Sequence, residues 1–521
     1  MSRVGSRTGR IAAVALGIAI GGLAAEGAVS LLLGRSLLRL GAERALPTFR
    51  LRALDEERIA AAARAEGCFA VDVDPWVSTR MKSRFEAKFL DGVAHTDDAG
   101  RRVRVGPPEE PGARRLVILG DSVAFGFGLN DDQTIAHATE AALAQAAEGK
   151  APRPVALTVA CPGWSFRNAY RALLDQQPGL RADLVYAFPV DNDLDDSFAL
   201  LETGYRATDF DPAAGASRAH IAGNHYFLLL STQQRRFPAI EFRHSVLVTG
   251  VTRESKRRYA ELARECRELH QRLAETGGRF AVAVLNDGVF QRRMLRALAE
   301  TAPEVPVVGL FDESREVDQL SGDPHPNRAF ARAIGWRVAE HALRQGWLPG
   351  VSADRLAPED PAYAKRHFEI PGRDDLLREQ AKIDRIAVEQ IGPRIDFDDG
   401  TGWHQVYGGI APDGTIGMNA AVVVGGAGGR LECAFDRLAD APSLYPLDLT
   451  FTFDGEAAAP VSVPAATGQG PVRFSVDVPA ALRGNELLDV EIHASNWIAR
   501  AVEGTTGLAS IRLRSIARTE R

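Results

Sequence analysis

The segment Leu116-Val-Ile-Leu-Gly-Asp-Ser-Val-Ala-Phe-Gly-Phe-Gly128 decides the fold. It opens with four consecutive apolar residues, Leu116–Leu119, and a glycine follows them, which is typical of a short buried strand that ends in a tight turn. Ser122 comes just after this predicted strand. In a doubly wound parallel sheet, ligands bind at the carboxyl ends of the strands, so this position suits a nucleophile. Taken alone, Gly-Asp-Ser is also an ordinary strand-to-helix turn.

The sequence on both sides of this segment alternates between strand and helix patterns. Short apolar runs predict three further buried strands: Val155–Ala160, Leu184–Phe188 and Phe280–Leu285. Helix-like spacing of apolar residues predicts three helices: Thr134–Ala147, Glu254–Glu275 and Arg328–Leu343. This alternation over residues 115–345 indicates a parallel sheet with helices on both faces.

Past residue 395 the apolar residues recur at every second position. Three such runs are separated by turns rich in glycine and proline: Leu447–Phe453, Val472–Val478 and Leu488–Ala494. This spacing predicts an antiparallel β-sandwich. Three aromatic residues in this region are candidates for glycan binding, although aromatic side chains in β-domains are more often part of the core: Trp403, Tyr407 and Trp497.

The N-terminus carries a long apolar segment. Ile11 to Leu33 carries no charged residue except Glu26, and it is long enough to span a hydrocarbon core of about 30 Å. Arginines precede it, as in a signal sequence or signal anchor. We expect an uncleaved single-pass membrane anchor with the rest of the chain outside the cytoplasm. A cleaved signal peptide and a buried N-terminal helix are the alternatives.

Composition excludes several classes of protein. Lys and Arg together number 62 against 68 Asp and Glu, a net charge of -6, so no global positive field would attract nucleic acid. The content of hydrophobic residues is 45%, which is ordinary for a folded protein. The four cysteines lie far apart with no Cys-x-x-Cys motif, so neither a disulfide framework nor a structural zinc site is expected. We also expect no metal and no cofactor.

Three further segments stand where the predicted strands and helices meet. Val159-Ala-Cys-Pro-Gly-Trp-Ser165 follows the second strand, Val190-Asp-Asn-Asp193 follows the third, and Gly322-Asp-Pro-His-Pro-Asn327 precedes the last helix. Together with Gly-Asp-Ser they resemble the four blocks of the GDSL/SGNH hydrolase superfamily, in that family's order. The resemblance implies a flavodoxin-like, doubly wound parallel sheet. The segment from His95 to Arg101 is also similar to the stretch that precedes the hydrolase domain in membrane-anchored bacterial members.

The resemblance also implies a role for each matched residue. Ser122 would attack an ester carbonyl, and His325 would act as its general base, since a hydroxyl is a poor nucleophile at neutral pH. Asp323 would orient the imidazole. The backbone N–H groups of Ser122 and Gly163 and the side-chain amide of Asn192 would form an oxyanion hole.

The chain departs from the family pattern at two positions. Val190 stands where the family usually has a glycine two residues before Asn192. Many members place the aspartate three residues before the histidine, where this chain has Gly322. The Asp-Pro-His spacing found here resembles certain branches, including acetyltransferases of exopolysaccharide assembly. Two other carboxylates remain alternatives for orienting His325: Asp312 and Asp318.

Simpler interpretations exist for two of these segments. Gly163 follows a proline and is explained equally well as a turn glycine, and Asn192 as a helix cap. The acidic run around Asn192 does not have the spacing of a calcium-binding loop. We interpret it as a solvated loop: Asp191, Asp193, Asp195 and Asp196.

These patterns predict five parts of the chain: a membrane anchor at 1–34, an extension at 35–112, a hydrolase domain at 113–350, a linker with a helix at 351–394 and a β-sandwich domain at 395–521. The leading hypothesis is a serine esterase that forms a covalent acyl-enzyme. Its partner would be an ester-bearing small molecule or an acylated glycan, with O-acetyl as one candidate group. An O-acyltransferase using the same Ser-His-Asp site is the first alternative. A non-catalytic, carbohydrate-binding surface protein is the second.

Overall fold

The computed structural model describes residues 69–520 with gaps at 72–78, 91, 148–150, 195–249, 322, 403–404, 411–413, 440, 466–469, 497 and 503–504. The predicted anchor within residues 1–34 lies outside the described residues, as do Trp403, Trp497 and the side chain of Tyr407. Within the described ranges, no helix is both long and apolar enough to cross a bilayer. The anchor and the glycan-binding aromatics therefore stay predictions.

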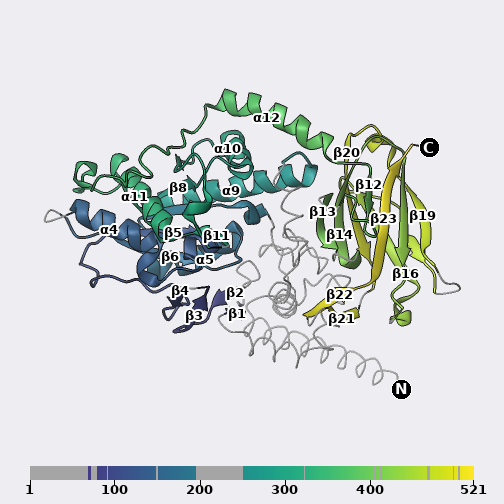
Figure 1. The fold of residues 1–521 in the computed structure, drawn as a ribbon, viewed down its shortest axis with the longest axis horizontal. Helices are drawn as coiled ribbons and strands as arrows, with labels where there is room; N and C mark the ends of the chain where they lie inside the picture. Colours follow the sequence, from purple (N-terminus) through teal and green to yellow (C-terminus); the bar gives the residue numbers. More distant parts are fainter. Residues whose placement is uncertain are drawn as a thin grey trace, which may run out of the picture.

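A five-stranded parallel sheet forms the centre of the N-terminal half (Figure 1). Its strands are β5 (Arg115–Gly120), β6 (Val155–Ala160), β7 (Leu184–Phe188), β8 (Arg279–Val284) and β9 (Val307–Gly309). The order in the sheet is β6-β5-β7-β8-β9, and every neighbouring pair is parallel. The apolar runs predicted as strands are thereby confirmed.

This strand order fixes where a ligand is expected to bind. The first strand, β5, lies between the second and the third, so the chain winds outward in opposite directions from it. Because parallel crossovers are right-handed, helices that follow β5 and β6 cover opposite faces of the sheet. The crevice at the carboxyl ends of β5 and β7 is the topological switch point, where ligands bind in such sheets.

Helices flank this sheet as the sequence predicts, and α4 packs against α11 while α5 packs against α9. Gly335 allows α4 and α11 to approach closely, because a Cβ there would lie 2.6 Å from the Cβ of Ala138. Thr252 caps α9 by accepting a hydrogen bond from the Ser255 amide. The helices are α3 (Ser122–Phe125), α4 (Ile135–Ala147), α5 (Phe166–Leu180), α9 (Arg253–Glu275), α10 (Val289–Thr301), α11 (Arg328–Arg344) and α12 (Arg373–Glu389), with short 3-10 turns η1 (Asp131–Gln133), η2 (Asp191–Leu194), η5 (Glu316–Asp318), η6 (Ala353–Arg355), η8 (Pro442–Leu444) and η9 (Ala480–Leu482).

Small antiparallel pairs lie outside the parallel sheet. One hairpin precedes β5 and pairs β3 with β4, and another, formed by β10 and β11, precedes α11. The strands are β1 (Phe69–Val71), β2 (Thr79–Met81), β3 (Glu86–Phe89), β4 (Gly92–His95), β10 (Gln319–Leu320) and β11 (Asp323–Pro326). The β10–β11 hairpin matters for the site, because it carries His325.

The C-terminal half is an antiparallel sheet in the order β17-β16-β20-β14-β23-β15-β19, with β12, β13 and β18 paired at its sides. The rings of Phe451 on β16 and Phe474 on β19 lie 6.2 Å apart although these strands are near opposite ends of that order. The sheet therefore folds over on itself and encloses a second core. Its strands are β12 (Arg394–Asp396), β13 (Val406–Ile410), β14 (Thr415–Gly425), β15 (Arg430–Asp436), β16 (Leu447–Phe453), β17 (Glu456–Ala457), β18 (Val461–Val463), β19 (Val472–Asp477), β20 (Leu487–Ala494) and β23 (Ile511–Thr519), with a separate pair β21 (Ile498–Val502) and β22 (Thr505–Ala509).

Candidate active site

Ser122 begins a one-turn helix at the carboxyl end of β5. Asp121 caps this helix: its Oδ1 accepts a hydrogen bond of 2.9 Å from the Val123 amide. Gly126 ends the helix with φ of 78°, a left-handed conformation that favours glycine. The Gly-Asp-Ser sequence thus produces a tight strand-to-helix turn that presents Ser122 at the switch point, with 9% of the residue exposed.

His325 lies within hydrogen-bonding distance of Ser122, although 203 positions separate them in the sequence. The His325 Nε2 atom is 2.7 Å from the Ser122 Oγ. The hydroxyl also lies 3.1 Å from Oδ2 of Asp121. The hydroxyl has one proton and two possible acceptors, and the shorter distance favours its donation to the imidazole.

An aromatic ring covers the imidazole. The Phe127 ring centroid lies 4.8 Å from that of His325, with an interplanar angle of 37°. Phe89, in the hairpin before β5, packs in turn on Phe127, with ring centroids 4.9 Å apart. Neither phenylalanine was singled out from the sequence, although Phe127 stands in the same Phe-Gly-Phe-Gly stretch as the serine turn.

Gly163 lies in the loop after β6 and has φ of 80°. A Cβ built on it would meet no heavy atom within 4 Å, so the space beside this glycine is open. Asn192 belongs to the 3-10 turn η2 that follows β7, and its side chain lies outside the described residues. Both residues therefore stand after strands that neighbour β5, as the sequence predicts for the ends of parallel strands.

Asp193 corrects the interpretation of the acidic run as a solvated loop. This residue is buried, with 5% exposed, and its Oδ2 accepts a hydrogen bond of 2.7 Å from the Val190 amide. Burial, and next the charge of Asp121, raise the pKa of Asp193 well above its usual range. The carboxyl thus fixes the turn that carries Asn192.

The carboxylate that orients His325 was left open by the sequence. Asp323 lies in β11, two residues before His325, and its side chain is outside the described part of the chain. Asp318 is buried and binds a different partner: its carboxylate accepts hydrogen bonds of 3.1 and 2.6 Å from Arg366. Asp312 lies 3.9 Å from Arg366 as well, so both alternative carboxylates face this arginine.

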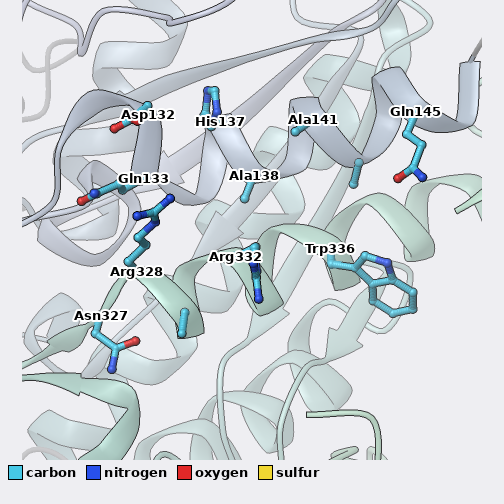
Figure 2. Close-up of a pocket in the computed structure, with 12 residues that line it drawn as sticks. Asp132, Gln133, His137, Ala138, Ala141, Gln145, Asn327, Arg328, Arg332 and Trp336 are labelled. Carbon is cyan, nitrogen blue, oxygen red and sulfur yellow. The ribbon is translucent and has the colours of Figure 1, made fainter. Parts of the chain in front are cut away.

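A groove of about 620 Å³ runs between α4 and α11 (Figure 2). It starts at Asn327, two residues after His325, but neither Ser122 nor His325 lines it. Its polar groups are partly engaged by the protein itself: Arg332 pairs with Asp360 at 3.0 Å, and the Trp336 indole N–H donates to a backbone carbonyl. Among the described residues, no cluster of three or more His, Cys, Asp or Glu side chains could hold a metal ion.

No family model and no curated protein matches the chain. Among solved structures it is similar to TesA, at 14% identity and a TM-score of 0.26, over 45% of this chain and 100% of that one. It is also similar to a two-domain esterase active on acetylated mannans, co-crystallized with mannopentaose, at 11% identity and a TM-score of 0.28, over 78% of this chain and 91% of that one.

Proposed function

We propose that this chain is a serine esterase that cleaves an ester through a covalent acyl-enzyme. The observation that carries the proposal is the distance of 2.7 Å between the Ser122 Oγ and the His325 Nε2. A hydroxyl and an imidazole at hydrogen-bonding distance are the minimum needed to activate a serine. Their place at the switch point of a doubly wound sheet supports a ligand-binding role as well.

The reaction proceeds in two halves. The Ser122 Oγ attacks the ester carbonyl while His325 accepts the hydroxyl proton, and a tetrahedral oxyanion forms. The imidazolium then gives its proton to the departing alcohol oxygen as the carbon–oxygen bond breaks, which leaves an acyl group on Ser122. Water attacks this acyl group while His325 accepts its proton, and the imidazolium then returns that proton to the Ser122 Oγ as the acyl–oxygen bond breaks, so the products are the alcohol and the acid.

Backbone and amide groups stabilise the oxyanion in this proposal. The N–H groups of Ser122 and Gly163 and the amide of Asn192 are the donors. The open space beside Gly163 supports this role, because a substrate must approach its donor without meeting a side chain. Each such donor typically contributes about 3–4 kcal/mol to transition-state stabilisation.

Asp323 is the residue we propose to orient the imidazole. Residues two apart in an extended strand share a face, and both Asp323 and His325 belong to β11. The engagement of Asp318 by Arg366 supports the same assignment, since a carboxylate that neutralises a buried guanidinium is poorly placed to serve a second cation.

The substrate class we propose is an acylated glycan, with O-acetyl as the group removed. The Asp-Pro-His spacing supports it, because the spacing resembles that of enzymes which handle acetyl groups on exopolysaccharides. We propose further that residues 1–34 anchor the chain in a membrane with the site on the extracytoplasmic face. Alkaline carbonate extraction tests the anchor: the full chain should stay in the membrane pellet, and the chain without residues 1–34 should be released.

Hydrolysis of p-nitrophenyl acetate tests the activity. The full chain in detergent should release p-nitrophenol, and Ser122→Ala should reduce the rate to that of buffer. Activity that persists in Ser122→Ala would refute the serine mechanism. Acetylated oligosaccharides are the next substrates, and transfer of acetyl to an added sugar hydroxyl instead of water would redirect the assignment to an acyltransferase.

A further inference from the structure

Arg102 is buried next to the serine turn, with 1% of its side chain exposed. A guanidinium has five N–H donors, and each of them has an acceptor here. Nε donates to the Asp131 carboxylate at 3.0 Å. The remaining donors bind the backbone carbonyls of Phe125, Gly126, Leu129 and Val93.

Three of these carbonyls belong to the segment that carries the nucleophile. Phe125 is the last residue of α3, the helix that Ser122 begins, and its carbonyl accepts a hydrogen bond of 2.9 Å from Arg102. The Gly126 carbonyl accepts one of 2.6 Å, and the Leu129 carbonyl accepts a third. The last carbonyls of a helix have no partner within it. Arg102 supplies that partner to a helix of only one turn.

The hairpin before Arg102 holds the same segment from a second side. The Asp131 carboxylate, which Arg102 binds, also lies 2.7 Å from the His95 Nδ1 atom on β4. At the hairpin turn, the backbone of Gly92 approaches residue 128 so closely that a Cβ on Gly92 would lie 2.4 Å from a backbone carbon of Gly128. Hairpin and serine loop are therefore packed backbone against backbone.

The hairpin also contacts the aromatic ring that packs on the histidine. Phe89 at the end of β3 packs on Phe127 with ring centroids 4.9 Å apart, and Phe127 packs on His325 at 4.8 Å. Phe89 lies in addition 5.8 Å from Phe125 in an edge-to-face contact. The hairpin and Arg102 thus contact the serine segment at two places: the arginine binds carbonyls at the end of α3, and Phe89 packs on Phe127, the ring that lies against His325.

We propose that residues 86–90 and 92–102 form a clamp that sets the position of Ser122 relative to His325, with Arg102 as its main positioning residue. This inference rests on the proposed esterase function. Neither Arg102 nor Phe89 touches the reacting atoms, so the clamp acts on the geometry of the pair and leaves substrate binding unchanged. A misplacement of about 1 Å at a reacting group typically costs about 10²-fold in rate.

The test compares Arg102→Lys with Arg337→Lys in the full chain. Arg337 is a matched control because its side chain is also buried, with 3% exposed. It likewise binds one carboxylate, Glu359, and two backbone carbonyls, in contacts with residues 359–366. A lysine has three donors and no planar fork, so both variants lose hydrogen bonds and should unfold at similarly reduced urea concentrations.

Both variants should lose stability, but only Arg102→Lys should also lose activity. We expect kcat for p-nitrophenyl acetate to fall between ten- and a hundredfold in Arg102→Lys, with KM within about twofold of the wild-type value. Arg337→Lys should keep kcat. If Arg102→Lys does not fold, Phe89→Ala replaces it as the clamp variant, and we expect it to lower kcat at least fivefold. Equal kcat values in the clamp variants, the control and the wild type would refute the clamp.

A second measurement keeps the clamp separate from the esterase proposal. Hydrogen exchange of the peptide covering residues 122–131 reports the amides of this segment, among them Gly126 and Phe127, which both donate to the Ser122 carbonyl. This peptide should exchange at least tenfold faster in the clamp variants and at the wild-type rate in Arg337→Lys. Unchanged exchange would overturn the clamp even if Ser122 proves catalytic. If the wild-type protein has no esterase activity but the clamp variants exchange faster, the result would support the clamp and refute the proposed function.

Discussion

Replacing Gly163 by alanine separates the two roles assigned to this residue, a turn glycine and an oxyanion donor. Gly163 has φ of 80°, and Gly277, in the turn after α9, has φ of 79°. A Cβ built on either glycine would meet no heavy atom within 4 Å. The new methyl group therefore clashes with no neighbour in either Gly163→Ala or Gly277→Ala. The two variants differ in the place of the glycine, since Gly163 follows β6 at the candidate site and Gly277 follows α9.

The magnitudes follow from the backbone. An L-residue held in the left-handed conformation costs about 1–2 kcal/mol, so both alanine variants should lose about that much stability. At position 163 the chain can relieve this strain by rotating the peptide, which turns the N–H away from the oxyanion. Removal of one oxyanion donor typically costs about 10²–10³ in kcat. If the backbone holds, the new methyl group stands in the open space that the substrate needs.

Urea unfolding and steady-state hydrolysis of p-nitrophenyl acetate measure the two effects. We expect similar losses of unfolding free energy in both variants, and a fall in kcat/KM of at least 30-fold, or about 2 kcal/mol, in Gly163→Ala alone. Wild-type kcat/KM in Gly163→Ala would refute the oxyanion role and leave a turn glycine. An equal loss of activity in Gly277→Ala would show that stability, and not donor geometry, controls the rate.

Three other predictions concern two carboxylates and the partly buried His341. Asp318→Asn should cost about 3 kcal/mol in urea unfolding, because the buried guanidinium of Arg366 loses its hydrogen-bonded carboxylate and keeps only Asp312, at 3.9 Å; kcat of the folded fraction should not change. Asp323→Asn should instead lower kcat by roughly 10⁴ at little cost in stability, and a wild-type rate in this variant would rule Asp323 out. Burial lowers the pKa of His341, whose Nδ1 lies 2.8 Å from the Tyr186 hydroxyl. The unfolded chain therefore binds more protons as the pH falls below about 6.5, so stability should decrease between pH 7.5 and 5.5, with a smaller decrease in His341→Gln.

Local pattern was sufficient for most of the parallel sheet. The strand at Val155–Ala160 and the helix predicted at Glu254–Glu275 agree with β6 and α9 to within a residue, because buried strands and amphipathic helices leave strong periodic signals. The helix α10 was missed, although Phe290, Met294 and Leu298 recur at four-residue spacing and are buried on it. That signal was present in the sequence after Gly288.

The clamp could not be predicted in the same way. Arg102 is one of many arginines, and nothing in its neighbours distinguishes it from Arg101 next to it, which pairs with Asp97 in a local turn. Three of its acceptors are carbonyls 23 to 27 positions away, and any residue type supplies a carbonyl. The burial of Asp193 was missed for another reason: its hydrogen bond from the Val190 amide is local, but its burial depends on the packing around the turn, which an acidic run does not indicate.

The sequence predicts the residues of the site from the order of their motifs, and the structure adds the distance between Ser122 and His325. Motif order alone does not bring Ser122 and His325 together. Their approach depends on the short β10–β11 hairpin, whose two-residue strand Gln319–Leu320 is too brief to leave a periodic signal.

Mapping the covalent intermediate tests the central claim most directly. The full chain is mixed with p-nitrophenyl acetate, quenched in acid within the first turnover and digested for peptide mass spectrometry. The account predicts one acetyl group on the peptide containing Ser122, absent in Ser122→Ala and greatly reduced in His325→Ala. Rapid turnover with no acetyl group on Ser122, or acetylation that persists elsewhere in Ser122→Ala together with full activity, would contradict it.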